Sequence, residues 1–289
     1  MSNIAWFARG GALAVAVLAG SAVTTPAQSL SYVGGLQYAT GDFIFAQRTW
    51  SAYLSNGLSW SAGRLRASAS IPLVMQPAGW LQYSGAGLMV PTGGMAGSTP
   101  SSTSNNPGMM NGGTMTPSGD MPFSAVGIGD PVARIDVALL RADAEHPVVS
   151  LVGVAKAPLA DVNRGFGTGE WDVGAGLSSA VKIAGISVFA EAVYWKLGNP
   201  PGASLRNAVA YAFSMGRALP RSRWSVLGTV SGASSLWTGL EAPVQAGAGV
   251  GYLLESGSSV FVTAAAGLTR TAPAISTGLG WRVPLGKAH

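Results

Sequence analysis

The charged side chains of this chain are few, and several of them interrupt apolar segments. Only 10% of the 289 residues are Asp, Glu, Lys or Arg. Glu191 is the clearest example, because Phe189 and Val193 flank it at the alternate positions on either side. An ionised side chain in such surroundings must face a polar interior and find a partner of opposite charge. We expect one shared interior to hold nine charges: Arg64, Arg66, Arg134, Asp136, Lys156, Asp172, Glu191, Arg206 and Arg282.

Two chemical roles fit an interior group of arginine and carboxylate side chains, and the sequence leaves both open. In the first, the charges form a polar constriction that selects among solutes. In the second, they form an ion-pair network that fills a narrow interior and holds it shut. Asp136 and Glu191 lie near the middle of their segments, and Arg66 and Arg134 are the partners that we expect for them.

Catalytic side chains are scarce. The chain has no cysteine and two histidines, His146 and His289, of which the second is the last residue. It contains no G-x-S-x-G, H-E-x-x-H or P-loop motif, and its glycine-rich stretches lack the spacing of a dinucleotide-binding loop. We therefore predict that the protein is not an enzyme and that it uses no cofactor and no metal.

The first residues have the features of an export signal. Arg9 is the only charge before the apolar run from Ala12 to Val23, and Thr25-Pro26-Ala27 supplies a small-x-small cleavage site. The run is too short to cross a bilayer, which takes about 20 apolar residues in a helix, and no longer run follows. We predict a signal peptide over 1–27 and a mature domain over 28–289, which would enter a membrane only as strands.

Alternation of apolar and polar residues predicts β-strands along the mature chain. In "RLRASASIPL" (64–73) every second residue is apolar and the gaps hold arginine and serine. Twelve such segments occur, at about 31–39, 48–59, 64–75, 130–141, 148–158, 171–182, 186–197, 205–217, 223–234, 244–254, 259–268 and 275–285.

The connections between these segments alternate between short and long, which is typical of outer-membrane barrels. The low charge and the mean hydropathy of +0.33 disfavour the alternative, a soluble β-sandwich or a secreted β-solenoid. We predict an all-β fold, a transmembrane antiparallel up-and-down β-barrel of about 12 strands. Its apolar faces would contact lipid and its polar faces would line a lumen. We expect interfacial aromatic residues at Trp50, Trp60, Trp171, Tyr194, Trp195, Trp224, Tyr252 and Trp281.

One connection is far longer than the others. Residues 77–129 are rich in Gly, Ser, Pro, Asn and Met and have too little apolar mass to form a core, so we predict a long, mobile external loop. Methionine sulfur can bind Cu(I), but no cysteine or histidine accompanies these methionines, and we interpret them as flexible apolar surface. The six are Met89, Met95, Met109, Met110, Met115 and Met121.

Several motifs between Gly127 and Leu285 resemble the MetA-pathway of phenol degradation family of outer-membrane proteins. They are the G-x-G-D sequence at 127–130, "VAKAPLAD" with Lys156, "GFGTGEWDVGAGL" with Asp172, and the last hairpin "GLTRTAPAISTGLGWRV". The resemblance implies an outer-membrane barrel through which hydrophobic, including aromatic, compounds enter a Gram-negative cell. It implies no catalytic residues.

Together these observations predict a monomer in the outer membrane of a Gram-negative cell, with membrane lipid and small hydrophobic solutes as its partners. The expected function is a channel for passive uptake of small hydrophobic or aromatic compounds. The alternative is a structural or adhesive surface barrel whose lumen is filled. The formal net charge of +5 does not favour nucleic-acid binding, because the basic residues are scattered along the chain.

Overall fold

The structure of the protein is a computed structural model. The structure describes residues 28–42, 48–76, 81–83, 89–91, 125–140, 147–162, 166–199 and 205–285. The predicted signal peptide, both histidines and most of the segment 77–129, including the side chains of its six methionines, lie outside the described residues. Within the described part of the chain, no helix is long and apolar enough to cross a membrane.

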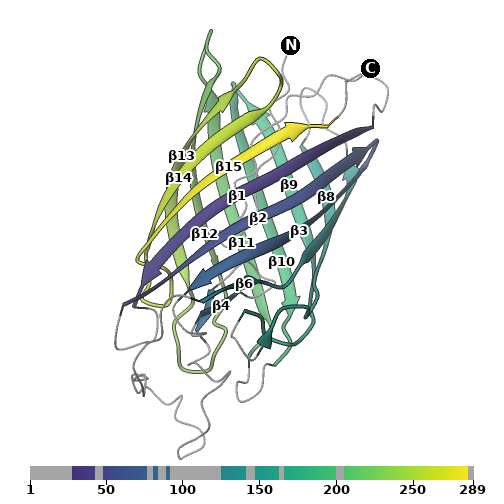
Figure 1. The fold of residues 1–289 in the computed structure, drawn as a ribbon. Helices are drawn as coiled ribbons and strands as arrows, with labels where there is room; N and C mark the ends of the chain where they lie inside the picture. The colour runs from purple at the N-terminus through teal and green to yellow at the C-terminus, as the bar shows by residue number, and fades with distance from the viewer. Residues whose placement is uncertain are drawn as a thin grey trace, which may run out of the picture.

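Twelve long strands form a closed antiparallel barrel (Figure 1). Each pairs with its neighbours in chain order, and the pairing of the first strand with the last closes the barrel. The strands are β1 (Ser29–Gly41), β2 (Thr49–Ala62), β3 (Leu65–Gln76), β7 (Val132–Leu140), β8 (Val148–Lys156), β9 (Asp172–Ile183), β10 (Ile186–Lys196), β11 (Ala208–Ala218), β12 (Trp224–Ala233), β13 (Val244–Leu253), β14 (Ser259–Gly267) and β15 (Ile275–Pro284). The predicted fold is confirmed, and the strand ends agree within a few residues.

Short turns gather at one rim of the barrel and long connections at the other (Figure 1). The turn between β9 and β10 is only Ala184-Gly185, and both residues have positive φ, 50° and 79°. Two such residues make the tight hairpin turn whose twist matches that of the flanking strands. β1 begins and β15 ends at this same rim, where Leu285 N donates to Leu30 O at 2.8 Å. In an outer-membrane barrel the rim with the short turns and the termini is the periplasmic one.

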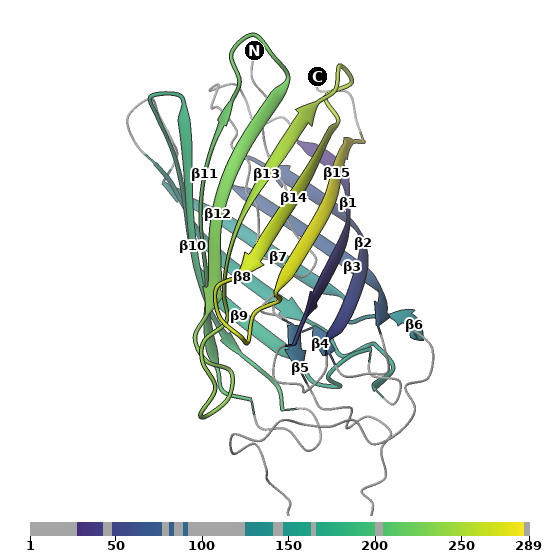
Figure 2. The ribbon, with the colours of Figure 1, turned by 90° about the vertical axis from the view of Figure 1, so that its left-hand side faces the viewer.

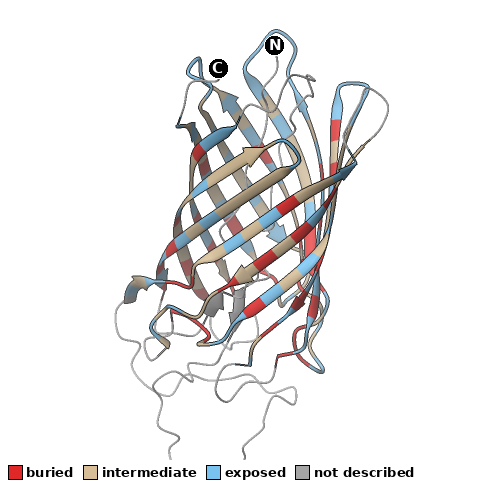
Figure 3. Cartoon of the chain, turned by 90° about the vertical axis from the view of Figure 1, so that its right-hand side faces the viewer, coloured by how far each residue is buried: buried red, intermediate tan, exposed pale blue. Residues whose placement is uncertain are grey.

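The two faces of the wall differ as the alternation predicts. On β3, Ile71 and Leu73 are 52% and 39% exposed on the outer surface, whereas Val74 is buried. On β7, Ile135 is exposed while its neighbour Asp136 is 4% exposed. Figure 3 shows the same alternation along the neighbouring strands. The apolar face of the segment 64–73 therefore faces outward, where a membrane supplies lipid.

Three short strands lie within the segment predicted as a long loop. β4 (Leu81–Tyr83) and β5 (Met89–Pro91) form a hairpin, and β6 (Ala125–Ile128) pairs with the outer end of β3. β6 and β7 together act as one interrupted strand beside β3, because Gly129 N donates to Pro72 O at 2.8 Å between the two ladders. Figure 2 shows β6 at the rim of the long connections, turned away from the line of β7.

Most of the predicted interfacial aromatic residues lie on the outer surface. Trp171, Tyr194, Trp224 and Tyr252 are exposed, and the rings of Trp224 and Tyr252 are 4.8 Å apart. Trp195 contradicts the prediction, because it is 5% exposed and belongs to the interior. The reason is its position on β10, two residues after the inward Val193 and next to the outward Tyr194.

Candidate functional site in the barrel interior

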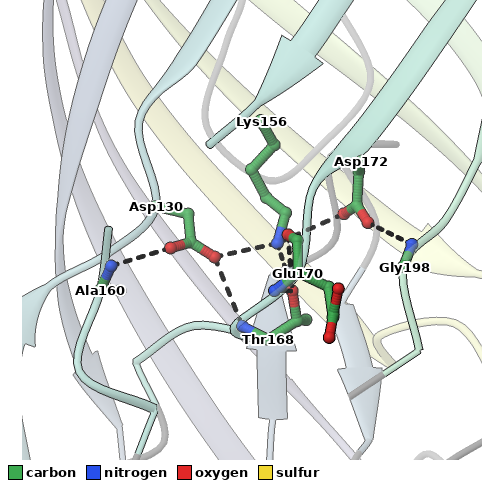
Figure 4. A network of polar contacts seen from close by, with 7 residues as sticks. All are labelled: Asp130, Lys156, Ala160, Thr168, Glu170, Asp172 and Gly198. Atoms are coloured by element: carbon green, nitrogen blue, oxygen red, sulfur yellow. Dashed lines mark hydrogen bonds and ion pairs between the residues drawn. The ribbon is translucent and has the colours of Figure 1, made fainter. Parts of the chain in front are cut away.

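Lys156 lies at the outer end of β8 and is fully buried among polar groups (Figure 4). Its Nζ is 2.9 Å from Asp130 Oδ2 and 3.3 Å from Asp172 Oδ2, and it also donates to Thr168 Oγ1. Asp172 is the partner of Lys156 in the β8–β9 ladder, whereas Asp130 precedes β7. An ammonium group removed from water is stable only when such partners replace its hydration. We call Asp130, Lys156, Thr168 and Asp172 the rim cluster.

The carboxylates of the rim cluster also bind backbone groups of the long connections. Asp130 Oδ1 accepts a hydrogen bond from Ala160 N at 2.9 Å, and Asp130 Oδ2 accepts one from Thr168 N at 3.3 Å. Asp172 Oδ1 accepts one from Gly198 N at 2.9 Å. The cluster therefore ties the start of β7, the β8–β9 connection and the β10–β11 connection together at the outer rim.

The glycines of the G-x-G-D sequence allow the close packing beside this cluster. A Cβ atom added to Gly127 would lie 2.4 Å from ring carbons of Phe166, which is 3% exposed. Phe166 belongs to the β8–β9 connection, so its ring covers the place where β6 turns away from β7. Only a residue without a side chain at 127 leaves room for the ring.

We expect Gly127→Ala to destabilise the barrel by about 1–3 kcal/mol, because the added methyl group overpacks the contact with Phe166. The free energy of unfolding in urea measures the effect. Gly228→Ala is the matched control, since its Cβ would meet no atom closer than 3.9 Å. Adding Phe166→Ala to the Gly127→Ala protein should remove most of the strain, and an equal loss in both glycine variants would contradict the packing argument.

A second group of charges lies near the middle of the barrel. Arg134 Nε is 2.7 Å from both carboxylate oxygens of Asp136, on the same strand. Its two terminal nitrogens donate to Glu191 Oε1 and Oε2 at 3.0 and 2.6 Å, in a bidentate pair that reaches from β7 to β10. All three side chains are at most 9% exposed. The arginine thus neutralises one carboxylate and is shared with the other, which leaves the three with a formal charge of −1.

The other predicted interior charges lie apart from these two groups or at their edge. Arg66 on β3 is half-buried and stands opposite Asp136 in the β3–β7 register. Arg282 Nε donates to Ser31 Oγ at 3.0 Å across the closing ladder. Arg206 precedes β11 and is exposed in the β10–β11 connection, because the strand begins at Ala208 and not at 205 as predicted. Arg64 is exposed in the β2–β3 turn.

An apolar cluster covers the inner wall near the outer rim. Trp195 on β10 and Trp237 from the β12–β13 connection are its largest members, and both are 5% exposed. The ring of Trp195 lies over Gly174 beside Val154, since a Cβ at Gly174 would meet both side chains within 3 Å. The remaining members are Val152, Val193, Leu197, Leu205, Ala208, Ala210, Ala233 and Leu236.

A different part of the inner wall is lined by small polar residues. Seven buried serine and glutamine residues of β1, β2, β12, β13 and β15 place hydroxyl or amide groups there and no charge. Ser55 Oγ, for example, donates to Gly35 O at 3.2 Å, and Gln245 Nε2 donates to Ser231 Oγ at 3.2 Å. The interior therefore has an apolar side and a polar side. The seven residues are Ser31, Gln37, Ser51, Ser55, Ser231, Gln245 and Ser276.

The closed barrel and its apolar outer face define an outer-membrane protein of a Gram-negative cell.

No protein-family model matches the chain, and no curated protein matches it. Among solved structures, an outer membrane channel from Pseudomonas putida F1 is similar with a TM-score of 0.61. The two chains are 9% identical, and the match covers 91% of this chain and 97% of that chain. The monoaromatic hydrocarbon channel CymD has a TM-score of 0.45 and 12% identity over 92% of this chain and 90% of that chain. At these identities the likeness concerns the fold.

Proposed function

We propose that the barrel is a channel for passive uptake of small hydrophobic or aromatic compounds across the outer membrane. The observation that carries this proposal is the apolar cluster on the inner wall, with Trp195 and Trp237 near the outer rim. A barrel whose lumen is filled, or a barrel that passes only ions, does not need two indole rings at its outer end. The resemblance of the G-x-G-D, Lys156 and Asp172 motifs to the MetA-pathway family supports the same class of solute.

The amphipathic interior suggests how such a compound would move. Burying apolar solute surface against the cluster gains about 25 cal/mol per Å². The polar side of the lumen and the charged group around Arg134 offer no comparable contact, so the solute leaves the cluster without meeting a second strong site. Conduction requires this combination, binding that favours entry and is weak enough for release. The gradient of the solute then drives the flow without an energy source.

A structural or adhesive barrel with a filled lumen is the second candidate. The paired charges of Arg134, Asp136 and Glu191 favour it, because a closed ion-pair network can hold a barrel interior shut. The two candidates differ in whether a solute or reagent reaches the middle of the lumen from water.

Cysteine substitution separates these candidates, since the natural chain has no cysteine. Ser178 is half-buried on the inner face of β9 and stands opposite Glu191, whereas Ala175 is exposed on the outer face of the same strand. We expect a bulky, water-soluble thiol reagent to modify Ser178→Cys and to reduce toluene uptake to background. Uptake would be measured in Gram-negative cells that make the variant in place of their own hydrophobic-solute channels.

Ala175→Cys is the matched control and should take up toluene at the unmodified rate after the same treatment. Intact cells are needed because a plain phospholipid bilayer lets toluene pass by itself. If Ser178→Cys is not modified and uptake equals that of cells without the protein, the lumen is closed and the structural candidate stands.

A further inference from the structure

The β12–β13 connection carries Trp237 onto the inner wall in a fixed position. Ser235 Oγ lies 2.5 Å from Trp237 O and 2.8 Å from Leu240 O, which holds the turn. Arg206 N donates to Leu236 O at 2.9 Å and so joins this connection to the one between β10 and β11. Leu236 and Trp237 are 3% and 5% exposed. The indole ring is therefore held in place before any solute arrives.

The polar atom of this ring makes no hydrogen bond within the described part of the protein. Trp237 Nε1 is buried and has no hydrogen-bond partner there. An indole nitrogen is a donor only, so it cannot be satisfied by turning the group around. Buried donors without a partner are rare in folded proteins and each needs a physical explanation. Here the surrounding cluster residues are all apolar, so none of their side chains can accept the hydrogen bond.

We propose that the apolar cluster is a binding site for small apolar solutes that carry one hydrogen-bond-accepting oxygen, such as ketones, aldehydes, esters and ethers. The inference rests on the proposed uptake function and narrows its solute class. The hydrocarbon part of the solute enters between Trp195, Val193 and Leu236, which are at most 5% exposed in its absence, and its oxygen accepts the hydrogen bond from Trp237 Nε1. A pure hydrocarbon of the same size leaves this donor unsatisfied, and an ion finds no opposite charge in the cluster.

The test compares cyclohexanone with methylcyclohexane, which are similar in size and differ in the acceptor oxygen. In purified full-length protein in detergent, Trp237→Phe keeps an aromatic ring and removes the donor. It should lower the affinity for cyclohexanone about tenfold relative to the natural protein, the effect of one hydrogen bond, and leave the affinity for methylcyclohexane nearly unchanged. Trp195→Phe is the matched control and should change both affinities by the same factor, because it changes ring size without touching the Trp237 donor.

A spectroscopic signal separates recognition from a general loss of packing. In nitrogen-15-labelled protein, the indole N–H resonance of Trp237 is identified by its absence from the Trp237→Phe spectrum. We expect cyclohexanone to shift this resonance and methylcyclohexane to leave it near its original position. The other indole N–H resonances then report whether Trp237→Phe has kept the native fold.

The possible results distinguish this site from the uptake function. If Trp237→Phe changes the affinities for both compounds by the same factor, or changes neither, the acceptor site is overturned. If cells also take up both compounds at equal rates through the barrel, uptake stands without the site. A cyclohexanone-dependent shift of the Trp237 resonance in a protein that supports no uptake would keep the site and overturn the channel.

Discussion

Replacing Lys156 with methionine should destabilise the barrel by about 3–5 kcal/mol, the cost of leaving a buried ion pair without one partner. Methionine has a similar length and no charge, so Asp130 and Asp172 would face each other with no cation between them. Both carboxylates are at most 3% exposed, and water cannot easily replace the ammonium group. The free energy of unfolding is measured in urea. Unfolding is monitored by the loss of the heat-modifiable gel migration that the folded barrel shows.

Lys182→Met is the control, since Lys182 lies exposed at the periplasmic end of β9. It should change the free energy of unfolding by less than about 0.5 kcal/mol, as ordinary surface substitutions do. Adding Asp130→Asn and Asp172→Asn to Lys156→Met should recover part of the loss, because no unpaired charge remains. If Lys156→Met and Lys182→Met unfold at the same urea concentration, the rim cluster does not hold the outer rim together.

Replacing Val137 with arginine should cost about 2–4 kcal/mol near the membrane midplane, because the charge would face lipid. Val137 is on β7 beside Asp136, and the two side chains point to opposite faces of the wall. Asp136→Asn should be milder for folding, since the amide still accepts a hydrogen bond from Arg134 in the interior. Refolding into lipid vesicles at a series of urea concentrations gives both free energies of unfolding.

The comparison also tests the register of this part of the barrel. Shifting a strand by one residue moves every side chain to the other face, so a register error would reverse the order of the two variants. If Val137→Arg and Asp136→Asn lower the free energy of unfolding by the same amount, β7 has no face in contact with lipid. Neither result is compatible with the pairing of Asp136 with Val152 on β8.

The barrel could be predicted because its strands depend on a local pattern. Ile71, Leu73 and their polar neighbours follow a period of two residues, and that period gives both the strand and its lipid face. The same logic places Glu191 in the interior, because its neighbours on β10 set its face. Arg134 could be proposed as its partner because few cations share that face, although the bidentate geometry needed the structure.

The outer rim could not be predicted in the same way, because connections have no period. Asp130 and Thr168 are not among the predicted site residues, although Asp130 belongs to the G-x-G-D motif on which the family resemblance rests. Their meeting with Lys156 depends on the path of the β8–β9 connection, which no spacing specifies. Trp195 is predicted at the lipid interface from its position near a strand end, although the period of two residues that places Glu191 and Val193 inside also places Trp195 inside.

The closing ladder between β1 and β15 has a consequence for assembly. The long strands from β2 to β14 each pair with the long strands before and after them, so hairpins can form as soon as two neighbours are available. β1 must wait for β15, whose residues from Ile275 to Pro284 lie almost at the end of the chain. Until then one edge of β1 presents unpaired backbone groups, which can pair with another copy and aggregate. Covering this edge with another molecule or with lipid until the last strand arrives would protect the newly made chain from aggregation.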